Sequence, residues 1–120
     1  MASYTVSVMK LLYVFLGGGL GASLRWGVSL LVPGTLGTQI VNVLGSFGLA
    51  LLLARAETNP TLKLLLGTGL MGGFTTYSTF NSDTLRHIEA GEPGKAVLNV
   101  VLTLLVCLGS GLLGLWLGRR

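Results

Sequence analysis

Long stretches without a charged residue alternate with short polar segments along the chain. A membrane-spanning helix needs about 20 apolar residues. Three uncharged stretches approach or exceed that length: Trp26–Ala54, Leu64–Ser82 and Ala96–Gly118. The first is too long for one straight helix and too short for two. Pro33 and Gly34 divide it, so its first part completes a helix that begins near Lys10.

This pattern predicts an all-α membrane protein in which residues 1–120 form a single transmembrane domain. We expect four transmembrane helices, with the third broken in the middle of the membrane near Gly72–Thr76. The four predicted spans cover Lys10–Leu31, Thr35–Ala54, Leu62–Ile88 and Gly94–Leu117. The connectors between them are short and carry Pro, Gly, Asn and Glu, which is typical of turns between antiparallel helices.

The third span contains two glycines followed by a cluster of hydroxyl groups, in the sequence Gly72-Gly73-Phe74-Thr75-Thr76-Tyr77-Ser78-Thr79-Phe80. Irregular backbone at membrane depth occurs only where it is buried in protein or lines a polar cavity. If the helix stops and restarts here, a threonine can cap the new N-terminus, while the first half ends in exposed carbonyl groups. Such carbonyls suit a cation, and the N–H groups of the second half suit an anion. The break therefore indicates an ion site or an ion pathway.

Asn42 is the outstanding polar residue of the second span, and by itself it supports two interpretations. Its amide can form a structural hydrogen bond between helices, worth about 0.6 to 2 kcal/mol in a membrane, or it can donate to an anion. The hydroxyls of Thr75 and Thr79 lie one turn apart, as do those of Ser78 and Ser82. This polar surface after the break favours a pathway.

Tyr77 and Phe80 are three residues apart and project from a common helix face. The ordinary interpretation of two aromatic residues at this spacing is core packing. An aromatic ring edge also carries partial positive charge, so a role beside an anion is the alternative.

The composition excludes several classes of function. About half of the residues (51%) are hydrophobic and 10% are charged, and the net charge of +4 comes from basic residues at the ends of the spans. We interpret these residues as anchors at the membrane edge rather than as a nucleic-acid surface. They are Lys10, Arg55, Lys63, Arg119 and Arg120. The single cysteine, Cys107, rules out a disulfide within one chain.

Enzyme chemistry finds little support in the sequence. The only histidine, His87, follows Asp83 by one helical turn and Arg86 by one residue, which predicts a surface cluster of ion pairs. No buried pair of carboxylates for acid–base catalysis can be drawn from the remaining acidic residues. We therefore do not expect an enzyme.

Small residues recur four positions apart and predict flat helix faces that pack closely. The pairs are Gly17 with Gly21, Gly18 with Ala22, Gly69 with Gly73, Ser110 with Gly114, and Gly114 with Gly118. Four short spans also offer little interior in which to bury their polar side chains. Self-association into at least a dimer is therefore expected.

These residues together resemble a known family. The third-span motif from Gly72 to Phe80 carries the resemblance, together with Leu24-Arg25-Trp26, Gly37-Thr38, Val41-Asn42 and Gly109-Ser110. They are similar to the Fluc (CrcB-type) bacterial fluoride channels over nearly the whole chain.

The resemblance implies a passive, fluoride-selective channel that exports fluoride across the bacterial cytoplasmic membrane and relieves its toxicity. It implies an antiparallel, dual-topology homodimer with two pores and a structural Na⁺ ion at its centre. The backbone carbonyls of Gly72 and Thr75 would bind Na⁺, and Arg25 would lie in the vestibule, where a plain interfacial anchor is the alternative. The ion pathway would be lined by Asn42, Tyr77, Phe80, Ser78, Thr79 and Ser110.

The chain departs from the family pattern at two places. The first aromatic position is Tyr77 where phenylalanine is usual, and the fourth span has Leu102, Val106 and Gly114 where polar side chains are common. Thr103 and Ser110 can substitute in part. A small dual-topology multidrug or cation exporter, and a structural membrane subunit that transports nothing, are the alternatives. The first span offers no ionisable group for proton coupling between Lys10 and Arg25.

Overall fold

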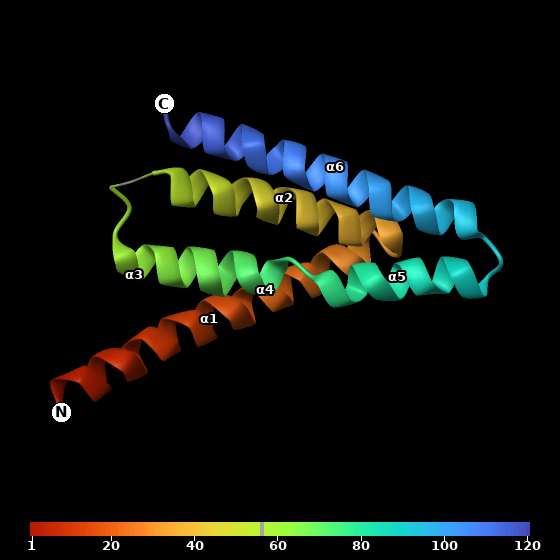
Figure 1. The fold of residues 1–120 in the computed structure, drawn as a ribbon. Coiled ribbons are helices and arrows are strands. Elements are labelled where there is room, and N and C mark those ends of the chain that lie inside the picture. The colour runs from red at the N-terminus through yellow and green to blue at the C-terminus, as the bar shows by residue number, and fades with distance from the viewer. Residues whose placement is uncertain (56) are drawn as a thin grey trace.

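The computed structural model describes residues 1–55 and 57–120, and these are helical with no strand. Three helices are long and apolar enough to cross a membrane: α1 (Ala2–Leu31), α2 (Thr35–Ala54) and α6 (Pro93–Gly118). In the sequence, α2 is followed by an interrupted segment of shorter helices, shown in green and cyan in Figure 1, and then by α6. The interrupted segment consists of α3 (Pro60–Leu62), the π-helix η1 (Lys63–Met71), α4 (Gly72–Phe74) and α5 (Tyr77–Glu89). The predicted all-helical class is confirmed.

The predicted bounds of the second helix are confirmed, whereas the first helix begins at Ala2 rather than near Lys10. The hydroxyls of Thr5 and Ser7 each donate to the carbonyl four residues earlier, at 3.2 and 3.0 Å. They thus bond along the helix, and nothing in this polar stretch breaks it.

The interrupted segment begins at Pro60 rather than Leu62. The Asn59 side chain accepts a hydrogen bond from the Thr61 N–H at 2.8 Å, and Pro60 occupies the first turn, where a missing N–H costs nothing. The π-helical geometry of η1 had no counterpart in the sequence prediction.

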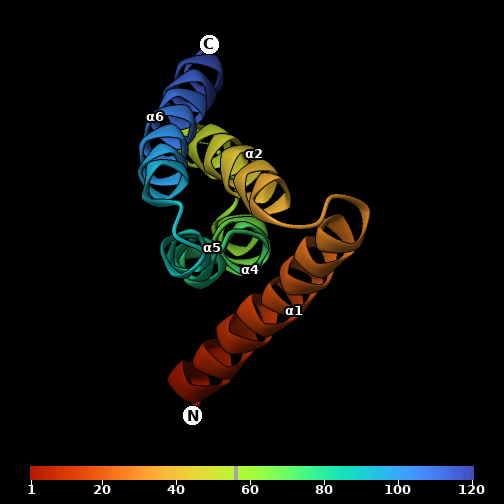
Figure 2. The same cartoon turned by 90° about the vertical axis from the view of Figure 1, so that its right-hand side faces the viewer.

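Helices α2 and α6 pack side by side, and α1 packs obliquely on η1 and α4 (Figures 1 and 2). Helix α5 lies against α6 and α2. The view down the molecule in Figure 2 shows α1 diverging from the group formed by α2, α4, α5 and α6.

Close contacts at glycines explain how α1 meets the interrupted segment. A Cβ atom at Gly17 would collide with the Leu65 carbonyl oxygen, and one at Gly21 would collide with the Leu70 carbonyl oxygen. From the other side, a Cβ at Gly73 would meet the Gly18 backbone. The predicted close packing at these small residues is confirmed, and Gly114 and Gly118 likewise let α6 approach α2.

Most large apolar side chains remain exposed on the single chain. The buried apolar residues among those described are Val41, Phe80 and Ala96, while apolar side chains along α1 and α6 are largely exposed. A surface of this kind suits the hydrocarbon of a bilayer or the face of another membrane-embedded chain. The protein is a multi-pass membrane protein.

Candidate functional site

The helical backbone is interrupted between α4 and α5. Helix α4 ends at Phe74, and Thr75 and Thr76 have extended backbone, with φ/ψ of −81°/155° and −152°/118°. Thr76 then caps α5, because its Oγ1 accepts a hydrogen bond from the Thr79 N–H at 3.2 Å. The two glycines, which the sequence placed in the break, are helical, and the two threonines are extended.

Asn42 on α2 pairs with the backbone of Thr76 through both ends of its amide. Its Oδ1 accepts from the Thr76 N–H at 2.7 Å, and its Nδ2 donates to the Thr76 carbonyl at 3.0 Å. Both residues are buried. The amide thus replaces the helical partners that an extended residue loses, and one N–H of Nδ2 remains for another acceptor.

This pairing changes which carbonyl groups are available at the end of α4. In a continuous helix the Thr76 N–H would bond to the Gly72 carbonyl, but here it bonds to Asn42. The Gly73 carbonyl accepts from Arg25 Nε at 3.1 Å, and the Met71 carbonyl accepts from both the N–H and the hydroxyl of Thr75. The Gly72 carbonyl is therefore released from the helical pattern at the point where its neighbours have partners.

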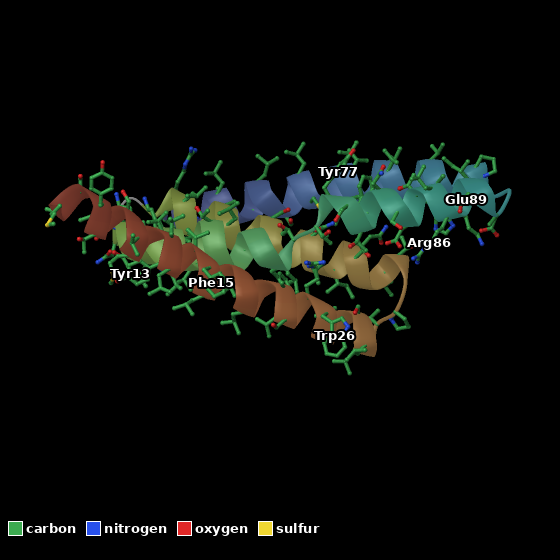
Figure 3. The ribbon with its side chains drawn as sticks, turned by 90° about the horizontal axis from the view of Figure 1, so that it is seen from below. Tyr13, Phe15, Trp26, Tyr77, Arg86 and Glu89 are labelled. Atoms are coloured by element: carbon green, nitrogen blue, oxygen red, sulfur yellow. The ribbon has the colours of Figure 1, made fainter. Side chains whose placement is uncertain are left out.

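A groove of about 490 Å³ lies beside the Asn42–Thr76 pair and brings four predicted site residues together. Asn42, Thr75, Tyr77 and Phe80 line it, together with Thr103 of α6. The Tyr77 and Phe80 rings are 5.6 Å apart and tilted by 57°. Phe80 is buried, whereas Tyr77 is 76% exposed and projects outward at the start of α5 (Figure 3).

A second, smaller cavity of about 140 Å³ collects Arg25 and Thr79, together with Thr38 of α2. Thr76 lines this cavity as well as the groove, so it lies between the two spaces. Of the predicted pathway residues, the groove is thus lined by Asn42, Tyr77 and Phe80, and the smaller cavity by Thr79.

Ser78 and Ser110 belong to neither lining. The exposed Ser78 hydroxyl lies 3.1 Å from Thr76 Oγ1, beside the cap of α5. The Ser110 hydroxyl lies 3.0 Å from both the Val43 and the Cys107 carbonyl oxygens, which ties α6 to α2.

The predicted surface cluster around His87 is partly wrong, because Asp83 is buried. It accepts a 2.7 Å hydrogen bond from the Thr38 hydroxyl, and the exposed Arg86 is 4.0 Å away. A polar partner on α2 makes this burial possible, and the spacing of charges along one helix gives no sign of it.

The remaining members of the cluster form a surface group at the α5–α6 turn, the end at which Figure 3 labels Arg86 and Glu89. His87 Nδ1 lies 3.5 Å from Glu92, and its Nε2 lies 3.3 Å from the Thr35 hydroxyl at the start of α2. The Lys95 ammonium, 2.7 Å from Glu92, holds the pKa of that carboxyl below its usual value.

Sequence reasoning missed a polar network centred on Asn99 of α6, which is only 3% exposed. Its Nδ2 donates to Thr84 of α5 at 2.9 Å, and its Oδ1 accepts from Gln39 of α2 at 3.1 Å. The residue type could have revealed this network from the sequence, since Asn99 is the only amide side chain in the uncharged stretch 96–118. A polar residue at membrane depth marks a contact or a functional site.

Comparison with known proteins identifies the family. Residues 12–116 match the family described as "CrcB-like protein, Camphor Resistance (CrcB)". A protein of Sorangium cellulosum (strain So ce56) named "Fluoride-specific ion channel FluC" is 42% identical to this chain, over 90% of this chain and 93% of its own length. A protein of the same name from Shewanella amazonensis is 45% identical over 88% of this chain and 92% of its own length. The chain therefore belongs to the CrcB-like family, as the third-span motif indicated.

Proposed function

We propose that this protein is a passive, fluoride-selective channel of the bacterial cytoplasmic membrane, which lets fluoride leave the cell and so relieves its toxicity. The names of its relatives support a channel rather than an enzyme. The observation in this chain that carries the proposal is the Asn42–Thr76 pair, which holds a helix N-terminus beside a groove lined by amide, hydroxyl and aromatic groups.

Fluoride holds its water strongly, so a pore must replace that water with closely spaced donors. The described residues supply three kinds. One kind of donor is the remaining N–H of the Asn42 amide, and a second is the Thr103 hydroxyl, whose only other contact as a donor within the described residues is a long one of 3.5 Å to Asn99. The third kind is the N–H groups in the first turn of α5 other than that of Thr79, which Thr76 caps. The ring edges of Tyr77 and Phe80 add partial positive charge without a strongly hydrated group. Thr79 and Arg25 would receive the ion on the other side of Thr76.

A structural Na⁺ ion fits the end of α4. Unwound backbone carbonyls are common ligands of Na⁺ in membrane proteins, and the Gly72 carbonyl is the one that the Thr76–Asn42 bond releases. We place Na⁺ on the Gly72 and Thr75 carbonyls. One chain offers two such oxygens, so a second copy is needed to complete the ligand set.

We propose that the second copy is inverted. Inversion brings two such breaks together near a two-fold axis, with each α3–α5 segment counted as a fourth, broken span. The basic residues favour neither orientation strongly, because Lys10, Arg55, Lys63, Arg119 and Arg120 face one side and Arg25, Arg86 and Lys95 face the other.

Proton-coupled transport is the competing function, and buried Asp83 is the observation that favours it, since such transport needs an ionisable group inside the protein. Its hydrogen bond from Thr38 and its 4.0 Å approach to Arg86 equally fit a structural role that ties α5 to α2. A proton gradient would separate the two functions. A passive channel gives fluoride flux that follows the fluoride gradient alone, whereas a coupled transporter drives fluoride uphill when a pH difference is imposed.

The decisive experiment is efflux from liposomes that contain only this protein. We expect rapid passive fluoride efflux and little chloride efflux. Absence of fluoride efflux from the reconstituted wild-type protein would overturn the proposal.

Orientation in the membrane is tested separately, with single cysteines placed at either end of a cysteine-free Cys107→Ser protein and labelled in intact cells. Each end should be reachable from outside in about half of the molecules, and labelling from one side only would exclude the inverted pair.

A further inference from the structure

A basic hollow of about 810 Å³ lies at the end of the molecule where α2 stops, α3 starts and the C-terminus emerges (Figure 1). Its polar lining residues are Arg55, Glu57, Thr58, Asn59, Arg119 and Arg120. We infer that this hollow binds the phosphate diester of an anionic phospholipid. The inference concerns a surface remote from the groove and does not rest on fluoride transport.

The position of the arginines sets the depth of the hollow. Arg55 and Arg119 are the first charged residues after the uncharged stretches 26–54 and 96–118, and each lies at the C-terminal end of its helix. In a bilayer, residues at the ends of such stretches lie at the level of the lipid headgroups. The phosphate of a lipid is therefore the anion that these side chains meet at the highest concentration.

The charges in the hollow are arranged to accept an anion. The hollow is lined by three arginines and one acidic residue, Glu57. In the described part of the chain none of the three arginines forms an ion pair with a carboxylate. The partial negative charge at the ends of α2 and α6 offsets only part of this excess. A guanidinium group can donate two parallel hydrogen bonds to a phosphate, and the Thr58 hydroxyl adds another donor.

The neighbouring apolar groups favour a lipid over free phosphate. The Arg120 guanidinium stacks over the Trp116 ring at 3.7 Å, so one face of this arginine covers an aromatic side chain at the membrane edge. Leu62 lines the same hollow and is 45% exposed. A phospholipid can place its phosphate among the arginines and its acyl chains along Trp116 and Leu62, so it contacts the basic and the apolar surfaces together.

The two tryptophans of the chain provide a direct test, because Trp116 lies beside the hollow and Trp26 lies on a different helix. In a Trp26→Phe protein, Trp116 is the only tryptophan. The protein is reconstituted in phosphatidylcholine containing a small fraction of brominated phosphatidylglycerol, and separately with the bromine on phosphatidylcholine at the same fraction. We expect Trp116 to be quenched several-fold more efficiently by the anionic lipid. Equal quenching by the two lipids would overturn the inference.

Two matched double variants distinguish a specific binding site from a general effect of positive charge at this end of the molecule. Arg55→Gln with Arg119→Gln leaves Arg120 stacked on Trp116. This double variant should abolish the several-fold preference for the anionic lipid, because each basic residue near the surface favours such a lipid about fivefold. Lys10→Gln with Lys63→Gln removes the same charge from the same end and should leave the preference unchanged. An equal loss in both pairs contradicts the site, as does an equal preference at Trp26 in a Trp116→Phe protein.

A competition experiment distinguishes lipid from free phosphate. Excess inorganic phosphate, matched in ionic strength by chloride, should leave the quenching pattern of the wild-type hollow in place. Loss of the preference in phosphate but not in chloride would assign the hollow to a soluble oxyanion and overturn the lipid assignment.

Discussion

The two halves of the interrupted segment are held in place by different kinds of contact. The first half, η1 with α4, meets α1 through backbone surfaces brought together by Gly17, Gly21 and Gly73. The second half, α5, meets α2 and α6 through side-chain hydrogen bonds, including Thr38 to Asp83 and Asn99 to Thr84. Asn42 lies at the junction and pairs with the backbone of the residue that separates them.

This difference follows from the bilayer as a solvent. Burial of apolar side chains gives little net drive between helices in lipid, because lipid tails are as apolar as leucine. Close backbone packing and interhelical hydrogen bonds are the alternatives, and each half uses mainly one of them. The first half is thus sensitive to added volume, and the second to lost polar groups.

The largest expected effect is that of added volume on the first half. In Gly21→Leu the new side chain meets the backbone of Leu70 and Phe74, which cannot move aside as a flexible side chain can. Overpacking that neighbouring side chains can absorb costs about 1–3 kcal/mol, and occasionally more. Here the colliding atoms belong to the backbone, so we expect a cost well above that range and loss of the monodisperse purified protein. Size-exclusion chromatography and thermal unfolding measure this. Gly19→Ala is the control, since a Cβ there meets nothing within 4 Å, and equal damage by both changes would contradict the packing argument.

The next largest effect is expected at the junction. Asn42→Leu leaves the N–H and the carbonyl of buried Thr76 unpaired, at a cost of about 1–3 kcal/mol for each group. It also removes the amide donor from the groove. A hydrogen bond to a charged group is worth about 1.5–3 kcal/mol, and each increment of about 1.4 kcal/mol added to a barrier lowers a rate tenfold, so loss of this donor should lower fluoride efflux from liposomes at least about tenfold. Leu44→Ala, at an exposed position of the same helix, should conduct normally. Vigorous efflux through Asn42→Leu would remove both roles of the amide.

Within the second half, the aromatic pair should respond unequally. Phe80 is buried and lines the groove, so Phe80→Ala opens space and removes a ring edge, and we expect poor fluoride conduction. Tyr77→Phe keeps the exposed ring and removes only a hydroxyl, so it should conduct like the wild-type protein. Fluoride efflux that is the same for Phe80→Ala and wild type would show that this ring does not contribute to the pathway.

The first half of the interrupted segment could be predicted from the sequence better than the second half. The small residues four apart predicted the close packing of the first half, because that contact depends on residue size along one helix. The burial of Asp83 and the Asn99 network depend on partners such as Thr38 and Gln39, which lie more than forty positions away in the sequence. The break was expected near Gly72–Thr76, and within that range the extended residues are Thr75 and Thr76 rather than the glycines, because the Asn42 amide on another helix supplies the partners for Thr76.

The smallest expected effect concerns that network in the second half. Asn99→Leu removes the bonds to Thr84 and Gln39, and single hydrogen bonds between membrane helices are worth about 0.6 kcal/mol on average. We expect a loss of about 1 kcal/mol in the free energy of unfolding in mild detergent, with fluoride efflux retained. Leu98→Ala, at the adjacent exposed position, is the control and should change stability less. If Asn99→Leu were as damaging as Gly21→Leu, the two halves would not differ in the way proposed, and the polar network would be as essential to assembly as the glycine contacts.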